Sequence, residues 1–146
     1  MPQAFIVDAV VREVRRLKGY PNLSILDLSC GEGEVLSQLA ADGCRIHGTH
    51  FRDDDYIIEN RVRLDAIPIT TGVDLQQRLP FEDGSFDVVL MTEVLEHLDS
   101  QFHIVAEVSR VVRSGGFFVF STPNLQRLHS RLQFFFTHGM NLKKYI

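Results

Sequence analysis

A short segment near the N-terminus carries the first residues that could bind a ligand. Asp27 lies in the apolar run Ser24–Leu28, and the small-residue turn Ser29–Gly33 follows at once. Glycines let a backbone approach a ligand closely, and the N-terminus of a following helix offers free N–H groups to an anion. An acid at the end of the strand would repel a pyrophosphate but attract an ammonium group. The segment therefore predicts a site for a ligand with an ammonium group beside a carboxylate.

The residues around this turn predict a strand, a turn and a helix in that order. Ser24–Leu28 is short and apolar, as buried parallel strands are. From Glu34 the apolar residues recur with helical spacing until Gly43, which ends the helix. Leu36 stands where the third glycine of a dinucleotide-binding turn is expected. Together with Asp27, it argues against a nucleotide-binding oxidoreductase.

Composition limits the class of protein and its partners. The 146 residues suffice for one domain with its own core, and 45% hydrophobic with 23% charged residues is ordinary for a soluble globular chain. A net charge of −4 disfavours a nucleic-acid partner. Cys30 and Cys44 indicate no disulfide framework, and no apolar run approaches the length of a membrane span. We therefore expect a reducing, cytoplasmic location.

Three segments resemble the class I S-adenosylmethionine-dependent methyltransferases. Asp27–Gly33 has the form D-x-S-x-G-x-G, which is similar to the family's first motif. Leu79–Val89, LPFEDGSFDVV, resembles the signature that precedes the family's fourth strand, and Arg110–Asn124, RVVRSGGFFVFSTPN, resembles the one around its fifth. The resemblance implies a Rossmann-like, doubly wound α/β fold. Its mostly parallel sheet would have the strand order 3-2-1-4-5, with helices on both faces.

The same resemblance predicts how the chain is divided. We expect one domain over residues 1–146, with an N-terminal helix at 1–19, a cofactor-binding core at 24–121 and a C-terminal helix at 125–138. Pro68 predicts that the third strand lies at an edge of the sheet. The family's sheet normally closes with an antiparallel strand pair after the fifth strand, whereas the residues after Ser121 indicate loop and helix. The closing strands are therefore expected to be absent or truncated.

The resemblance also implies where S-adenosylmethionine would bind, across the carboxyl ends of the strands. The cofactor-binding residues that it implies are Asp27, Ser29, Cys30, Gly31, Gly33, His50, Asp74, Leu75, Thr92 and Glu93. Asp74 and the next backbone N–H would contact the adenine edge. Glycine is usual at the position of Ser29, and serine is tolerable there if its backbone angles are ordinary.

The end of the second predicted strand, Arg45–Phe51, departs from the family pattern. An acid that binds both ribose hydroxyls usually stands where this chain has His50, and an imidazole can make one such hydrogen bond but no bidentate contact. One of the three acids at Asp53–Asp55 could supply the carboxylate instead. Alternatively, these acids only favour the start of a helix at Tyr56–Arg61. Both interpretations stay open.

Glu93, Glu96 and His97 match an E-x-x-E-H pattern that a subset of the family uses to bind a divalent metal. That subset includes ubiquinone-pathway O-methyltransferases and small-RNA 2′-O-methyltransferases. A magnesium ion held there would orient vicinal oxygens of a substrate and lower a hydroxyl pKa. The alternative, which we favour, is that the three residues brace the loop and cap the next helix. His97 is also a candidate general base, as is His50.

The predicted function is methyl transfer from S-adenosylmethionine to a small-molecule acceptor or to a cell-envelope, lipid-linked one. The lipid-linked option follows from the sequence T-P-N and an amphipathic run after it, although core packing is the favoured explanation of that run. The second class is a methyltransferase fold that has lost catalysis and serves as a binding or scaffold subunit. Ser29, His50 and the missing closing strands motivate that alternative. The oligomeric state is left open.

Overall fold

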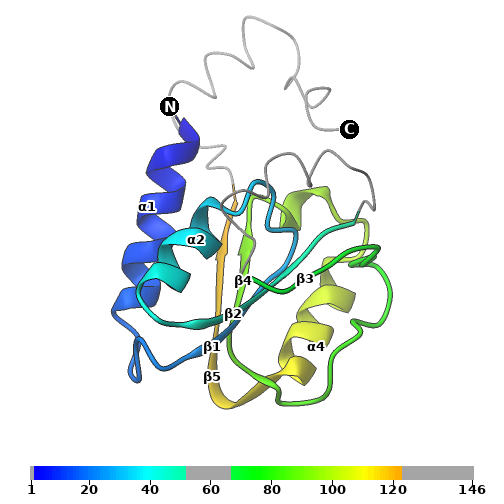
Figure 1. Cartoon of the computed structure of the whole chain (residues 1–146). Helices are drawn as coiled ribbons and strands as arrows, with labels where there is room; N and C mark the ends of the chain where they lie inside the picture. Colours follow the sequence, from blue (N-terminus) through cyan, green and yellow to red (C-terminus); the bar gives the residue numbers. More distant parts are fainter. Residues whose placement is uncertain (1, 52–66, 123–146) are drawn as a thin grey trace, which may run out of the picture.

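The computed structural model describes residues 2–51 and 67–122, which form one sheet with helices on both of its faces (Figure 1). The strands are β1 (Ser24–Asp27), β2 (Arg45–Thr49), β3 (Ile69–Thr70), β4 (Phe86–Thr92) and β5 (Val112–Ser121). The helices are α1 (Pro2–Arg15), α2 (Glu34–Ala41), the short 3₁₀ helix η2 (Leu95–His97) and α4 (Gln101–Val111). The segments expected to form helices at 56–61 and 125–138 lie outside the described residues.

The sheet has the order β3-β2-β1-β4-β5, and all four pairings are parallel. The predicted strand order and fold class are thereby confirmed. Ile25 and Leu26 of the central strand β1 are fully buried. The chain leaves β1 toward β2 on one side and returns to β4 on the other. In open sheets of this kind, ligands bind at the carboxyl ends of the strands where the order reverses, which here is between β1 and β4.

Two hydrophobic cores enclose the sheet, one on each face. Successive strand residues point to opposite faces, so Ile25 packs into one core and Leu26 into the other. The first core joins the sheet to α1 and α2, and the second joins it to α4 and to the segment before β4. Burial on both faces explains why these strands are nearly continuous apolar runs, with Asp27 and Thr49 as the buried polar exceptions.

The two edge strands differ in length from those that the sequence predicts, which are Ile67–Val73 for the third strand and Phe117–Ser121 for the fifth. β3 pairs with β2 over two residues only, and it lies at the sheet edge, as Pro68 predicts. β5 begins at Val112, which pairs with Phe86 of β4. The register then shifts between Phe86 and Val88, so the glycine-containing residues 113–116 lie within the strand as an irregularity. Within the described residues, no helix is long and apolar enough to cross a membrane.

Candidate functional site

Asp27 is the most unusual residue at the carboxyl edge of the sheet. It ends β1 between Gly48 of β2 and Leu90 of β4, and only 3% of its surface is exposed. No cation or hydrogen-bond donor of the described chain reaches its carboxylate, and burial alone raises its pKa to about 7. A buried carboxylate without a partner is unfavourable. The position is therefore suited to a ligand that brings a positive charge or a strong hydrogen-bond donor.

The turn after β1 is held by the end of β2. Thr49 is 1% exposed, its hydroxyl oxygen accepts a hydrogen bond from the Ser29 N–H at 3.0 Å, and its carbonyl accepts one from the Cys30 N–H at 3.0 Å. Ser29 has a φ of 63° and Gly31 one of 53°. Ser29 thus does not meet the condition of ordinary backbone angles under which serine is tolerable there, since it takes the left-handed conformation that glycine adopts without strain. The turn presents its backbone at the strand end.

The side chain of Cys30 lies in the close packing around Gly48 of β2. A Cβ atom at Gly48 would come within 2.5 Å of the Ile69 side chain, 2.8 Å of the Leu36 side chain and 3.0 Å of the Cys30 sulfur, so a larger residue there would displace these side chains. Burial, with a smaller contribution from the charge of Asp27, raises the pKa of the Cys30 thiol to about 12. This environment disfavours the thiolate form that a nucleophilic cysteine needs.

The end of β4, next to β1 in the sheet, is tied to β5. The Glu93 N–H donates to the carbonyl and hydroxyl oxygens of Ser121, and the Ser121 hydroxyl donates to Glu93 Oε1 at 2.8 Å. Glu93 also has a left-handed backbone, with a φ of 56°. The Thr92 hydroxyl oxygen and Glu96 Oε2 are buried and have no hydrogen-bond partner among the described residues. Polar groups that could accept a ligand thus follow both β1 and β4.

The three residues of the possible metal site are engaged in different contacts. Glu93 binds Ser121, as described, and so braces the ends of β4 and β5. His97 Nε2 lies 3.9 Å from Glu96 Oε1. Over residues 2–51 and 67–122, no group of three His, Cys, Asp or Glu side chains is placed to hold a metal ion. The cap of α4 is Ser100, whose hydroxyl accepts from the His103 N–H.

His50 and Asp74 lie at the same edge of the sheet, beyond β2 and β3. The His50 N–H donates to the Thr70 carbonyl, and the His50 carbonyl accepts from the Val73 N–H. Asp74 Oδ1 accepts from the Gln76 N–H at 2.9 Å, which closes a tight turn. The following Leu75 is buried. The acids at 53–55 lie outside the described part of the chain, so the choice between them and His50 stays open.

The sequence analysis missed two residues that shape this edge, Thr49 and Ser121. Both are polar residues at the last position of a parallel strand, next to a predicted loop. This placement is the signal that could have identified them, because strand ends at the switch point of a sheet are where polar side chains meet a ligand or hold its loop.

Comparison with known proteins decides the family. Residues 26–120, well over half of the chain, match the family model described as a methyltransferase domain. The chain belongs to the class I S-adenosylmethionine-dependent methyltransferases. It is 38% identical over 100 residues to a probable S-adenosylmethionine-dependent methyltransferase of Mycolicibacterium smegmatis, covering 68% of this chain and 38% of that protein.

Other methyltransferases in the comparisons carry more specific names. The chain is 31% identical over 113 residues to a ubiquinone biosynthesis O-methyltransferase of Colwellia psychrerythraea, covering 73% of this chain and 44% of that protein. It is 30% identical over 122 residues to the 27-O-demethylrifamycin SV methyltransferase of Amycolatopsis mediterranei, covering 77% and 44%. The chain thus spans less than half the length of these relatives.

Solved structures share the fold. A methyltransferase from Archaeoglobus fulgidus superposes with a TM-score of 0.72 at 21% identity, covering 90% of this chain and 58% of that one. The PH0226 protein from Pyrococcus horikoshii also gives 0.72, at 23% identity, covering 88% and 61%. At this level of identity the likeness establishes the methyltransferase fold and not the acceptor.

Proposed function

We propose that this chain binds S-adenosylmethionine and transfers its methyl group to an oxygen atom of a small-molecule acceptor. The observation that carries the proposal is the buried carboxylate of Asp27, which has no partner among the described residues, beside the left-handed turn at Ser29. The methionine part of the cofactor bears an ammonium group, which is the partner that this carboxylate lacks. The two relatives with specific names are, by those names, O-methyltransferases, which favours oxygen as the acceptor atom.

The residues at the edge of the sheet would each contact a different part of the cofactor. Asp27 would bind the ammonium group, and the turn at 29–33 with the N-terminus of α2 would lie along the carboxylate. His50 would contact the ribose, and Asp74 with the Leu75 N–H would contact the adenine. Thr92 and Glu93, at the end of β4, would lie over the side of the cofactor that faces the acceptor.

The protein need not form a covalent bond with either reactant in this reaction. When bound, the cofactor supplies a sulfonium-activated methyl group, so the chain contributes mainly by positioning two reactants and excluding water. An acceptor hydroxyl must lose a proton, and His97, 3.9 Å from Glu96 Oε1, is the side chain proposed to take it. A lipid-linked acceptor is the alternative to a small molecule. Glu93, Glu96 and His97 are not grouped to hold a metal ion in this structure, so no step is assigned to magnesium.

Calorimetric titration with S-adenosylhomocysteine, the product form of the cofactor, tests the proposal. We expect micromolar binding by the chain and a loss of at least tenfold in affinity for Asp27→Asn, which keeps the shape of the side chain but not its charge. Glu82→Gln, a change at an exposed acid away from this edge, is the matched control and should bind normally. A folded chain that binds no S-adenosylhomocysteine would point instead to a binding or scaffold subunit.

A further inference from the structure

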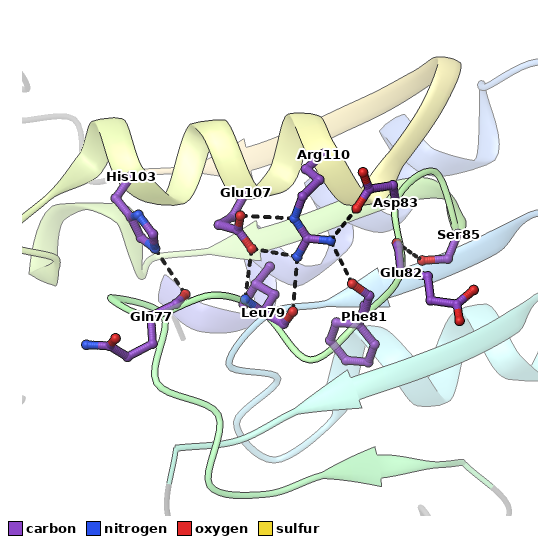
Figure 2. Close-up of polar contacts among 9 residues, drawn as sticks. All are labelled: Gln77, Leu79, Phe81, Glu82, Asp83, Ser85, His103, Glu107 and Arg110. Atoms are coloured by element: carbon purple, nitrogen blue, oxygen red, sulfur yellow. Dashed lines mark hydrogen bonds and ion pairs between the residues drawn. The ribbon is translucent and has the colours of Figure 1, made fainter.

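One face of α4 is joined to the irregular segment 77–83 by side chains that bond to its backbone. Figure 2 shows His103, Glu107 and Arg110 on successive turns of the helix, each directed at this segment. The bonds are His103 Nε2 to the Gln77 carbonyl at 3.0 Å, the Leu79 N–H to Glu107 Oε2 at 2.8 Å, and Arg110 to the carbonyls of Leu79 at 3.0 Å and Phe81 at 2.7 Å. Arg110 also pairs with Asp83 at 2.8 Å.

The order of these contacts is the same along both segments. The helix residues are four and three positions apart, so they lie on one face, and they advance about 10 Å along the axis. Their partners Gln77, Leu79 and Phe81 follow one another at intervals of two residues, in a segment without regular secondary structure. The segment therefore runs beside α4 in the same direction, with one bonding site for each helical turn.

The central pair of this arrangement is well shielded from water. The side chains of Glu107 and Arg110 are 13% and 17% exposed and lie 2.6 Å apart. Hydrogen bonds from Arg110 lower the pKa of Glu107 to about 2, so the pair is fully charged at neutral pH. A shielded ion pair adds little net stability compared with apolar packing, but with all its bonds satisfied it can specify one geometry. Apart from the Asp83 side chain, its other partners are backbone groups, so the geometry specified is that of segment 77–83.

The first contact lies one turn from Asp74. The Gln77 carbonyl binds His103, and the Gln77 N–H donates to the Asp74 carbonyl at 3.0 Å. The Gln76 N–H donates to Asp74 Oδ1, and no described residue bonds to Oδ2. The position of this carboxylate and of the Leu75 N–H beside it is therefore set by a turn whose far end is held by α4.

We propose that His103, Glu107 and Arg110 are positioning residues for base selection at the cofactor site, acting through Asp74. This inference rests on the proposed function, in which Asp74 and the Leu75 N–H bind the adenine edge. Adenine offers an amino donor at C6 and an acceptor at N1, whereas hypoxanthine offers an acceptor and a donor in the reverse order. A rigidly held carboxylate and N–H select adenine, because hypoxanthine leaves both groups unpaired.

The test compares S-adenosylhomocysteine with S-inosylhomocysteine, which differs only in the base, by calorimetry on the whole chain. We expect the wild-type protein to favour the adenine ligand by tenfold or more. His103→Phe and Arg110→Lys, which cannot make the same backbone bonds, should reduce this ratio several-fold. Asp74→Asn should abolish it, and His103→Phe should have no further effect on the ratio in the Asp74→Asn background. Ser109→Ala, on the exposed face of α4, is the control and should keep the wild-type ratio.

The outcomes separate this inference from the function on which it rests. An unchanged ratio in both His103→Phe and Arg110→Lys would overturn the positioning role. Equal binding of the two ligands by the wild-type chain would also overturn it, while the methyltransferase proposal stands. Failure of the wild-type chain to bind either ligand would refute both. A role confined to stability would lower the melting temperature of the variants and leave the ratio unchanged.

Discussion

Ser29 and Glu93 follow the neighbouring parallel strands β1 and β4, and both take a left-handed backbone conformation, with φ of 63° and 56°. They are the non-glycine residues with positive φ in the described part of the chain. This conformation costs a residue with a Cβ atom roughly 1–2 kcal/mol. Backbone strain is therefore concentrated at the edge where we place the cofactor, which is common for functional sites.

Replacing Ser29 by glycine should stabilise the free protein. Glycine adopts the observed φ without strain, which stabilises the native state. This gain in free energy should exceed the cost of the larger conformational entropy of glycine in the unfolded chain by up to about 1 kcal/mol. Urea denaturation measures the change in the free energy of unfolding. Ser109→Gly, at an ordinary helical position of α4, is the opposing control and should destabilise by about 1 kcal/mol. Equal destabilisation by both changes would contradict the assignment of strain to Ser29.

The buried carboxylate of Asp27 should make the stability of the free protein fall as pH rises. Its pKa is about 7 in the native state against 3.8 for the ordinary group, so between these values the native state binds more protons than the unfolded one. The free energy of unfolding should decrease between about pH 4 and pH 7, by an amount of order 4 kcal/mol at most.

Asp27→Asn should remove this pH dependence and be more stable than the wild type at pH 8, while binding the cofactor poorly. Urea denaturation of both proteins at pH 5 and pH 8 provides the measurement. The same loss of stability between these pH values in the variant would show that another group is responsible.

Cofactor binding should release protons in a way that depends on pH. At pH 6 the carboxyl of Asp27 is mostly protonated in the free protein, and an ammonium group placed beside it would lower its pKa. We expect close to one proton released per S-adenosylhomocysteine bound at pH 6 and almost none at pH 8.5. Titration in two buffers with different ionisation enthalpies counts these protons. Asp27→Asn, studied at concentrations that still give binding, should show no such release.

Because of Glu107, the free energy of unfolding should show the opposite pH dependence in acid. The pKa of Glu107 is lowered to about 2 by hydrogen bonds from Arg110, so the unfolded state binds more protons than the native state below about pH 4.5. Stability should therefore fall as pH decreases from about 4.5 to about 2, by roughly 3 kcal/mol at most. Glu107→Gln keeps an acceptor for the Leu79 N–H and should flatten this part of the curve. Acid titration of the unfolding free energy in both proteins compares them, and parallel curves would refute the assignment.

The fold was predictable because its signals are local. The acid-and-glycine turn after β1 and the segment LPFEDGSFDVV each lie within a short stretch, and together they imply the sheet order that the structure has. The edge position of β3 was also predictable from a local signal, Pro68, because proline has no N–H for a sheet hydrogen bond.

Features that depend on contacts between distant residues were not predictable. The positive φ of Ser29 is indicated only by the glycine that is usual at its position, and the hydrogen bonds from the turn to Thr49 of β2 that accompany it are not indicated at all. Glu107 and Arg110 are three residues apart, and in the sequence they resemble an ordinary surface ion pair on a helix. Their bonds to the backbone of Leu79 and Phe81 join segments almost thirty residues apart, so only the folded structure reveals them.

The pairing of α4 with segment 77–83 also limits how this chain can vary. Apart from the ion pair with Asp83, its bonds go to backbone groups, so the exposed side chains of Gln76 and Arg78 can be exchanged with little effect on it. The number of residues cannot change as freely, because one insertion between Gln77 and Phe81 would move every later backbone group one position away from its partner on the helix. Among related domains that keep the three helix residues, this segment should therefore keep its length even where these exposed side chains differ.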